Sequence, residues 1–173
     1  MKYPVKRFVI PDKLRNYPNG RIPDSLMAES PAIGKLYQGA AWWATVMVNE
    51  ARKDGITLKP ISNGYRSYDR QYALFMERYS DKPTGRVPTV TRIWNQRTWY
   101  LRKGFAPCAT PGYSNHGWGC AQDWGVDKPQ TLEWLRKNAP RFHWYWECQP
   151  TLPNGKPNVN WEPWHLQWIW DGN

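Results

Sequence analysis

The sequence has no apolar run approaching the ~18 residues that a membrane-spanning helix needs, and its mean hydropathy is −0.81. It shows no internal repeat or low-complexity block, so a repeat architecture is excluded. The chain opens with basic residues but without the continuous apolar stretch of a secretory signal peptide (MKYPVKRFVIPDKL). We therefore expect a protein that is made in the cytoplasm and does not insert into a membrane.

Cysteine is scarce, with three residues in the chain. The spacing of Cys108, Cys120 and Cys148 fits neither a disulfide framework nor paired zinc ligands. Three buried thiols are the preferred interpretation, and one disulfide with one free thiol is the alternative.

Histidine is equally scarce, and this restricts where a metal could bind. The three histidines are His116, His143 and His165. A metal site built on imidazole must draw on this set and complete itself with carboxylates.

Positive charge and tryptophan are abundant. Lys and Arg number 24 against 14 Asp and Glu, which gives a formal net charge of +10, and 13 of the 173 residues are Trp. The charge implies an anionic partner, either nucleic acid or an acidic polymer such as a bacterial cell wall. The aromatic content excludes a disordered chain, and the length fits one domain, 1–173. Most of the tryptophans are expected to be core and sheet residues.

Hydrophobic periodicity and turn residues predict an α+β fold, with a small antiparallel sheet flanked by about three helices. The N-terminal part, 1–31, is rich in Pro, Asn and Gly and predicts an irregular arm. The segment 80–112 is predicted to be a long loop near the functional site, with a short helix around 92–101. Predicted helices cover 34–53, 70–79 and 128–138, and predicted strands cover 56–62, 142–147 and 164–170.

Two segments place a histidine near a carboxylate. In the first, Gly117 and Gly119 let the backbone bend tightly, so that His116 and Asp123 can converge. Two His and one Asp leave one position of a four-coordinate zinc open for catalysis.

In the second segment, Glu162 and His165 are three residues apart, and in a regular strand they would face opposite ways. A bend at Pro163 is therefore predicted, which would bring both side chains to one site. In the strand that follows, Trp164, Leu166, Trp168 and Trp170 are predicted to form a core-facing stripe.

Three motifs resemble those of the zinc D-Ala-D-Ala peptidase family, which comprises VanY-like carboxypeptidases and related phage cell-wall peptidases. The family pattern S-x-H-x-x-G-x-A-x-D appears at 114–123, and E-P-W-H appears at 162–165. The third motif, S-x-G-Y-R-S-Y followed by Gln, appears at 62–71. The three occur in the family's order, and the similarity extends from about residue 19 to residue 170, so the joint match is specific.

The resemblance implies roles for individual residues. Zinc would be bound by His116, Asp123 and His165, with Glu162 as catalytic base and proton shuttle. Arg66 would hold a substrate carboxylate or stabilise the oxyanion, and its alternative is a structural ion pair. The candidate substrate-binding residues are Ser114, Gln71, Tyr65, Trp118 and Trp161.

Some of these positions have a simpler interpretation. The hydroxyl of Ser114 is a candidate turn cap. Cys120 and Gln122 stand where the family more often has aliphatic residues; Cys120 is expected to be buried, and Gln122 to alter hydrogen bonding around Asp123. His143 is expected to be structural.

The resulting expectation is a monomeric zinc peptidase that hydrolyses the peptide part of bacterial peptidoglycan, as a phage endolysin or its catalytic domain. It would accumulate in the cytoplasm and meet the wall when the membrane is opened. The nearest alternative is a D-Ala-D-Ala carboxypeptidase that trims stem peptides. A non-catalytic wall-binding module is a third possibility, but it has no need of Glu162. No nucleic-acid-binding motif accompanies the charge, so nucleic acid is not an expected partner.

Overall fold

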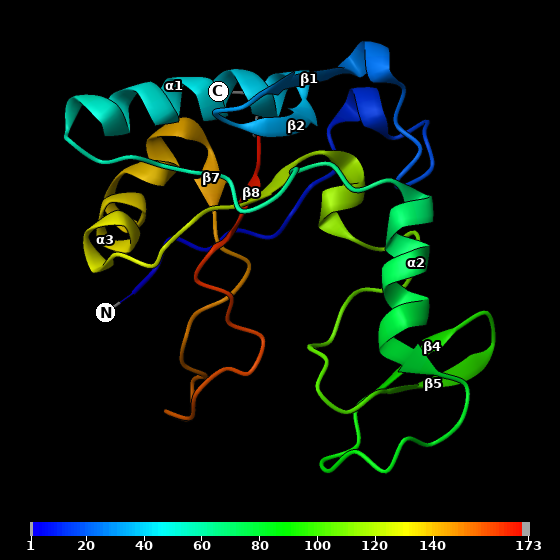
Figure 1. Ribbon diagram of the computed structural model, residues 1–173. Coiled ribbons are helices and arrows are strands. Elements are labelled where there is room, and N and C mark those ends of the chain that lie inside the picture. The colour runs from blue at the N-terminus through cyan, green and yellow to red at the C-terminus, as the bar shows by residue number, and fades with distance from the viewer. Residues whose placement is uncertain (1, 171–173) are drawn as a thin grey trace.

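The computed structural model describes residues 2–170 and has the expected α+β architecture (Figure 1). The helices are α1 (Gln38–Lys53), α2 (Tyr68–Arg78) and α3 (Pro129–Asn138), with 3-10 turns η1 (Asp12–Leu14), η2 (Asp24–Leu26), η3 (Asn115–Trp118) and η4 (Ala139–Phe142). The strands are β1 (Met27–Ser30), β2 (Gly34–Tyr37), β3 (Tyr79–Ser80), β4 (Thr91–Trp94), β5 (Arg97–Leu101), β6 (Ala121–Asp123), β7 (Trp144–Tyr145) and β8 (His165–Trp168). No helix among the described residues is long and apolar enough to cross a membrane.

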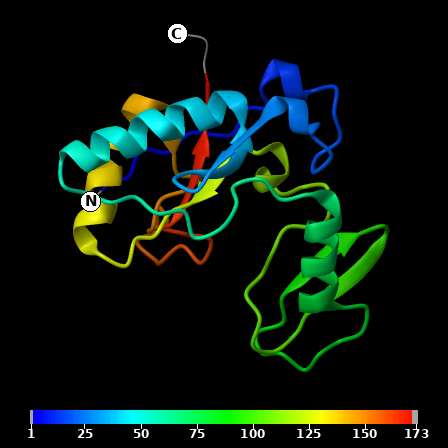
Figure 2. The ribbon, with the colours of Figure 1, turned by 45° about the horizontal axis from the view of Figure 1, so that its top comes forward.

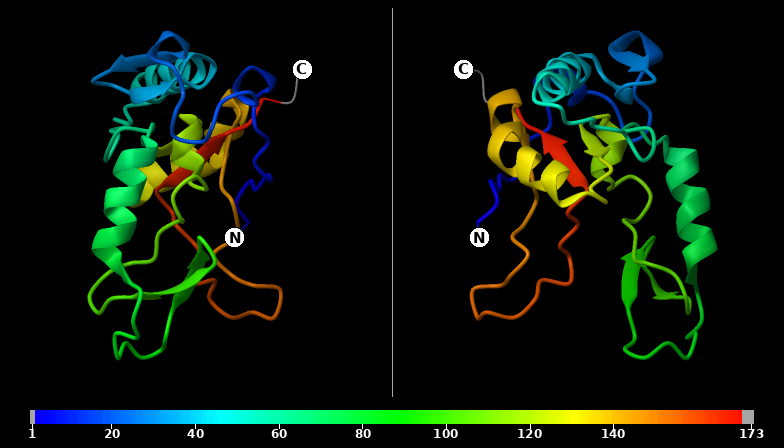
Figure 3. Two further views of the ribbon diagram at one scale, coloured as in Figure 1. Left: turned by 90° about the vertical axis from the view of Figure 1, so that its right-hand side faces the viewer. Right: turned by 60° about the vertical axis from the view of Figure 1, so that its left-hand side comes forward.

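All three sheets are antiparallel. Their strand orders are β1-β2, β3-β5-β4 and β6-β8-β7. The β6-β8-β7 sheet lies in the main body with α1 and α3 around it, as Figures 1 and 2 show. Residues 146–163 connect β7 to β8 and project from this body in the same general direction as the β4-β5 hairpin (Figures 1 and 3).

The main core joins α1 to the central sheet. Small residues of α1, among them Ala40 and Ala44, are fully buried and let the helix approach closely. Large indoles fill the remaining space, with Trp124 and Trp144 at 0% exposure and Trp146 at 1%. Most of the tryptophan therefore serves the scaffold, because each buried indole removes a large apolar surface from water.

A second, smaller core holds the 80–112 segment in place. Phe75 of α2 and Tyr79, which begins β3, pack with Trp99 and Leu101 of β5. The rings of Phe75 and Trp99 meet edge to face at 5.4 Å. The hairpin thus docks on α2 through its own aromatic cluster and forms a lobe that extends away from α1 (Figure 3).

Several predicted elements were wrong. The predicted short helix at 92–101 is the β4-β5 hairpin, since Asn95 and Gln96 adopt positive φ and make the two-residue turn that reverses the chain. The predicted helix at 34–53 begins at Gln38, because residues 34–37 pair with β1 instead. The predicted strand at 56–62 is only an isolated bridge between Pro60 and Trp124, and proline has no N–H to extend a ladder.

The N-terminal arm is less irregular than predicted. It contains β1 and two 3-10 turns, and it contributes Leu14 and Ile22 to the main core. The thiol prediction was also partly wrong: Cys120 is buried, whereas Cys108 and Cys148 are half-exposed, and all three are free thiols.

The final strand is shorter than predicted and is buried on both faces. Every residue of β8 is buried. Leu166 and Trp168 belong to the main core as expected, but Trp164 and Trp170 lie outside the strand and are 38% and 44% exposed. The strand's other face is also buried, since His165 and Gln167 are 7% and 0% exposed.

Candidate metal centre

The structure brings His116, Asp123 and His165 together. Their candidate ligand atoms all lie within 4.8 Å of one another. His116 stands in η3, Asp123 ends β6 and His165 begins β8. Asp123 and His165 are direct cross-strand partners in the antiparallel ladder. The sheet register therefore places two of the three side chains, and the turn before β6 supplies the third.

Hydrogen bonds orient the two imidazoles. His116 Nδ1 lies 2.9 Å from the carbonyl oxygen of Gly64. Because that oxygen only accepts, Nδ1 carries the proton and Nε2 keeps its lone pair. Nε2 of His116 lies 3.5 Å from Asp123 Oδ1, and Nδ1 of His165 lies 2.9 Å from the same oxygen. The three donor atoms thus converge on one small volume.

Glycines make this convergence possible. A Cβ on Gly64 would lie 2.2 Å from Cδ2 of Leu36 and 2.5 Å from Oε1 of Gln122, so the carbonyl that orients His116 needs glycine at this position. A Cβ on Gly117 would lie 2.1 Å from the side chain of Asn19. Asn19 is buried there and donates to the Ser114 carbonyl at 2.8 Å, which fixes the turn that carries His116.

The electrostatics of the cluster favour a negative carboxylate. Burial alone would raise the pKa of Asp123, but the neighbouring His116 and His165 hold that pKa well below the usual range. Burial lowers the pKa of His116 and keeps its imidazole neutral. For His165, burial acts in the same direction, but the hydrogen bond and charge of Asp123 outweigh it and raise the pKa. The cluster is thus an anionic oxygen between two imidazoles.

This donor set suits a zinc ion. Zinc prefers imidazole nitrogen and carboxylate oxygen at bond lengths of about 2.0–2.2 Å, which in a tetrahedron places neighbouring donors roughly 3.3–3.6 Å apart. The separations of 2.9 and 3.5 Å around Asp123 Oδ1 need only a small adjustment to meet this requirement. Three protein donors leave one position open, as in catalytic rather than structural zinc sites.

Glu162 lies beside the cluster because the chain turns at Pro163, as predicted. The backbone N–H of His165 donates to the Glu162 carbonyl at 3.1 Å, and Trp146 Nε1 donates to the Pro163 carbonyl at 3.1 Å. The Glu162 side chain is exposed. Its pKa is raised, first by partial desolvation and then by the negative charges of Asp123 and Glu147, against the opposing effect of His165. A carboxylate with a raised pKa is a better proton acceptor near neutral pH.

Arg66 is tied to the cluster by its backbone and to α2 by its side chain. Its N–H donates to the His116 carbonyl at 3.0 Å, and its Nη1 donates to Gln71 Oε1 at 2.9 Å. Gln71 is buried and donates in turn to the Ala109 carbonyl at 2.6 Å. Within residues 2–170, no carboxylate lies at ion-pair distance from Arg66, so the structural ion pair considered from the sequence does not form. Burial lowers the pKa of Arg66, although Asp123 acts in the opposite direction.

The other predicted substrate residues differ in their surroundings. Ser114 is buried next to His116, and its hydroxyl makes no capping hydrogen bond, so the turn-cap alternative is wrong. The Tyr65 hydroxyl accepts from the Ile22 N–H at 3.2 Å and ties the N-terminal arm down. Trp118 and Trp161 are half-buried against the main core.

His143 occupies a structural position. It has φ +64 and ends η4. Its ring lies edge-on between the rings of Trp43 and Trp170, with centroid separations of 4.6 and 4.7 Å. This agrees with the structural role expected for the third histidine.

Sequence reasoning missed Asn115. Its Nδ2 donates to Glu147 Oε1 at 2.8 Å and to Gln167 Oε1 at 3.1 Å, which links the His116 turn to β8. The only sequence signal was its place next to His116. Gln122 was noted from the sequence, and its Nε2 donates to the carbonyls of Ser62 and Asp123. These amides hold the backbone of the ligand segments in position.

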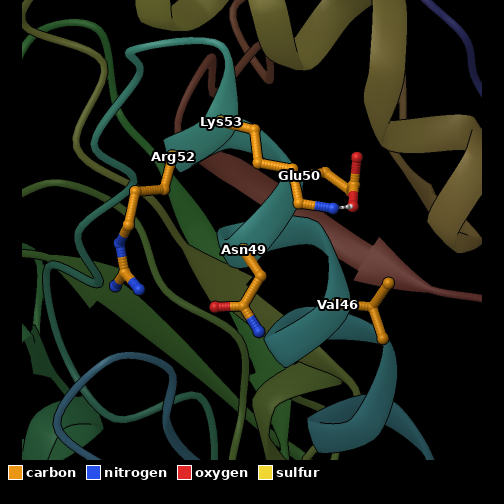
Figure 4. A pocket seen from close by; sticks show the side chains of 5 residues that line it. All are labelled: Val46, Asn49, Glu50, Arg52 and Lys53. Atoms are coloured by element: carbon orange, nitrogen blue, oxygen red, sulfur yellow. Dashed lines mark hydrogen bonds and ion pairs between the residues drawn. The ribbon is translucent and has the colours of Figure 1, made fainter.

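Two of the hollows on the surface formed by residues 2–170 lie away from the cluster. One is a shallow hollow along α1, lined by Val46, Asn49, Glu50, Arg52 and Lys53 (Figure 4). Lys53 and Glu50 pair with each other there, and no imidazole or thiol lines it. The other lies between the β4-β5 hairpin and residues 109–113.

Comparison with known proteins identifies relatives. The sequence model of the family VanY, D-alanyl-D-alanine carboxypeptidase, matches residues 34–171. Over 164 residues, the chain is 28% identical to the protein named Putative carboxypeptidase YodJ of Bacillus subtilis (strain 168). The match covers 86% of this chain and 52% of YodJ, so the chain spans about half the length of that relative.

Solved structures share the fold. The vancomycin-resistance D,D-pentapeptidase VanY, a mutant in complex with Zn(II), superposes with a TM-score of 0.54 at 21% identity over 90% of this chain and 84% of that one. VanYB in complex with D-alanine-D-alanine gives 0.56 at 20% identity, over 90% and 83%. The LdcB LD-carboxypeptidase gives 0.53 at 24% identity, over 93% and 67%.

Proposed function

The chain belongs to the VanY family of D-alanyl-D-alanine carboxypeptidases, and on this premise we propose that it is a zinc-dependent carboxypeptidase acting on the stem peptides of bacterial peptidoglycan. The observation that carries the proposal is the convergence of His116, Asp123 and His165 within 4.8 Å, with Glu162 beside them. Structural relatives solved with Zn(II) and with D-alanine-D-alanine support the same chemistry.

In this proposal, different residues act in different steps of the hydrolysis. Zinc, when bound by the two imidazoles and the carboxylate, supplies a Lewis acid that polarises a carbonyl and lowers the pKa of water to about 7. Glu162 takes the proton of the attacking water and passes it to the amine that leaves. Arg66, held by Gln71, presents a planar guanidinium to the substrate's carboxylate or to the developing oxyanion.

Product analysis tests this proposal. The zinc-loaded protein is incubated with a stem pentapeptide ending in D-Ala-D-Ala, and the products are identified by mass spectrometry. We expect release of the terminal D-Ala by the wild type, and release about 10²–10⁴-fold slower by Glu162→Gln with its zinc content unchanged. Full activity of Glu162→Gln, or intact peptide after incubation with the wild type, would overturn the proposal.

Cleavage inside a cross-linked peptide is a second candidate activity. The observation that favours it is the hollow between the β4-β5 hairpin and residues 109–113, which offers room for a peptide longer than a terminal dipeptide. Digestion of purified peptidoglycan separates the two activities, because an endopeptidase generates new internal termini and a carboxypeptidase releases only a terminal residue. A lytic role in phage release is the corresponding biological prediction, and lysis of cells from within would test it.

A further inference from the structure

The hollow beside the β4-β5 hairpin has the form of a binding pocket. It has a volume of about 620 Å³ and is lined by residues 92–95 of the hairpin and, from the facing segment, by Ala109, Thr110 and Tyr113. Tyr113 is 78% exposed and Ile93 is 77% exposed. Large apolar side chains that are this exposed at a pocket mark a surface suited to a ligand rather than to the core.

This pocket is connected to the metal centre by a short chain of contacts. Ala109, in the pocket wall, accepts the hydrogen bond of Gln71, which in turn accepts from Arg66. The wall then continues through the turn in which the Tyr113 N–H donates to the Thr110 carbonyl at 3.1 Å. The next residues along the chain lead directly into the His116 turn. A peptide held at the metal centre therefore has a path along 109–113 into the pocket.

Arg92 is the only charged residue among those that line the pocket. It is half-buried, and Nη1 donates to the carbonyl of the adjacent Thr91 at 3.2 Å. Within the described residues 2–170, no carboxylate lies at ion-pair distance from it. A partly buried guanidinium with spare donors is well suited to bind a carboxylate in a two-pronged geometry.

Positive charge also lies near Cys108, which precedes the pocket wall in the chain. Burial raises the pKa of the Cys108 thiol, and Arg78, Arg66 and Arg92 all act in the opposite direction. Cys108 therefore lies within electrostatic reach of both Arg66 and Arg92. Arg66 at the metal centre and Arg92 in the pocket therefore both place positive charge near Cys108, next to the pocket wall, which favours an acidic ligand over a neutral one.

We propose that the pocket lined by Arg92 and Tyr113 is a subsite for an acidic peptide segment, in which Arg92 binds a substrate carboxylate upstream of the cleaved bond. This inference rests on the proposed function, because a carboxypeptidase leaves all of its substrate except the last residue upstream. Tyr113 and Ile93 supply apolar contact to the peptide backbone and side chains.

The test measures binding and turnover separately. The probes are two peptides that end in D-Ala-D-Ala and differ only in carrying glutamate or glutamine upstream. Calorimetry with the zinc-loaded Glu162→Gln protein gives the affinity for each, with and without Arg92→Gln. Arg97→Gln is the matched control, because Arg97 is an exposed arginine of the same hairpin outside the pocket lining.

We expect Arg92→Gln to weaken binding of the glutamate peptide by about 10-fold or more, as for loss of a charged hydrogen bond, and to leave the glutamine peptide unchanged. In the enzyme with Glu162 intact, the loss should appear in KM and not in kcat. Equal affinity of the wild-type pocket for the two peptides, or equal losses with Arg97→Gln, would overturn the subsite. Unchanged binding of the glutamine peptide shows that the Arg92→Gln fold is intact. Arg92-dependent binding without hydrolysis by the wild type would instead overturn the proposed function and leave the subsite standing.

Discussion

Asp123 and His165 face each other across the β6-β8 ladder, and Asp123 Oδ1 lies 2.9 Å from His165 Nδ1. The pair is set by strand register, which the main core fixes on one face of the sheet. A slip of one strand by one residue would turn its side chain to the opposite face and separate the pair. The backbone of the candidate metal centre is therefore as stable as the sheet that carries it. We expect it to keep its conformation without a bound metal.

Removal of metal should therefore abolish activity without unfolding the protein. His165 Nδ1 can donate to Asp123 Oδ1 when no ion is bound, and the Gly64 carbonyl still orients His116. We expect chelation to eliminate hydrolysis, to leave the far-ultraviolet circular dichroism unchanged, and to lower Tm only by the lost binding energy. Activity should return with zinc.

Substitution of the ligands gives the complementary result. His116→Ala should reduce zinc from about one per chain to near zero after dialysis, because three protein donors are the usual minimum of a catalytic site. His143→Ala is the control, since His143 packs between Trp43 and Trp170 and is not part of the cluster. Metal analysis of both variants checks this, and retention of zinc by His116→Ala would contradict the assigned site.

We expect Glu162→Gln to lower the catalytic rate without destabilising the folded protein. Loss of the general base is expected to lower kcat by about 10²–10⁴-fold. The pKa of Glu162 is raised in the folded protein above its usual 4.5, so the folded state binds this proton more tightly than the unfolded state does. As pH rises through the window between these two pKa values, ionisation of Glu162 lowers the stability of the folded protein.

Glutamine removes that ionisation. We expect the metal-free Glu162→Gln protein to have a modestly higher Tm than the metal-free wild type at pH 7.5, and the difference to vanish near pH 4. Thermal unfolding at the two pH values measures it. A lower Tm for the variant at pH 7.5 would show that the carboxylate is stabilising in the folded state.

Arg66→Lys should be far from conservative. Arg66 reaches Gln71 through one guanidinium nitrogen, which leaves the other donors for substrate. Lysine provides a point charge without the planar fork, so one of these two interactions is lost. We expect kcat/KM to fall by about 10²–10³-fold, with zinc content unchanged. Steady-state kinetics with metal analysis tests this, and Arg70→Lys on the exposed side of α2 is the control.

The sequence allowed the grouping of His116, Asp123 and His165 and the turn at Pro163 to be predicted, because each depends on short motifs that are visible along the chain. The β4-β5 hairpin was not predictable in the same way. Its turn residues, Asn95 and Gln96, are not the Asn-Gly pair that usually marks such a turn. Its stability comes from Phe75 in α2, which is distant in sequence. Tertiary packing of this kind overrides local propensity.

The orientation of the His116 ring was equally hard to predict from the sequence. The carbonyl that fixes its tautomer belongs to Gly64, which lies in a different motif of the chain. Asn115 was overlooked for the same reason, since both of its partners are remote in sequence. Hydrogen bonds between distant segments leave no periodic pattern, so only the folded chain reveals them.

Gly64→Ala tests this remote support of the metal centre. The added Cβ would clash with the side chains of Leu36 and Gln122, and it would lie 2.6 Å from the backbone carbonyl oxygen of Ala121, which belongs to β6 and cannot swing aside as a side chain can. We expect a destabilisation of about 1–3 kcal/mol, as for overpacking of a core. The Gly64 carbonyl should also move away from His116 Nδ1, which should weaken zinc binding by roughly 10–100-fold.

Gly125→Ala is the matched control for this substitution. A Cβ there would meet Lys59 and Asp127 only at 3.6 and 3.7 Å, which is ordinary contact, so both stability and zinc affinity should stay close to the wild type. Chemical denaturation and competition with a zinc chelator measure the two quantities. If Gly64→Ala lost stability but bound zinc as tightly as the wild type, the Gly64 carbonyl would have no part in orienting His116, because its displacement would then leave the ligand geometry intact.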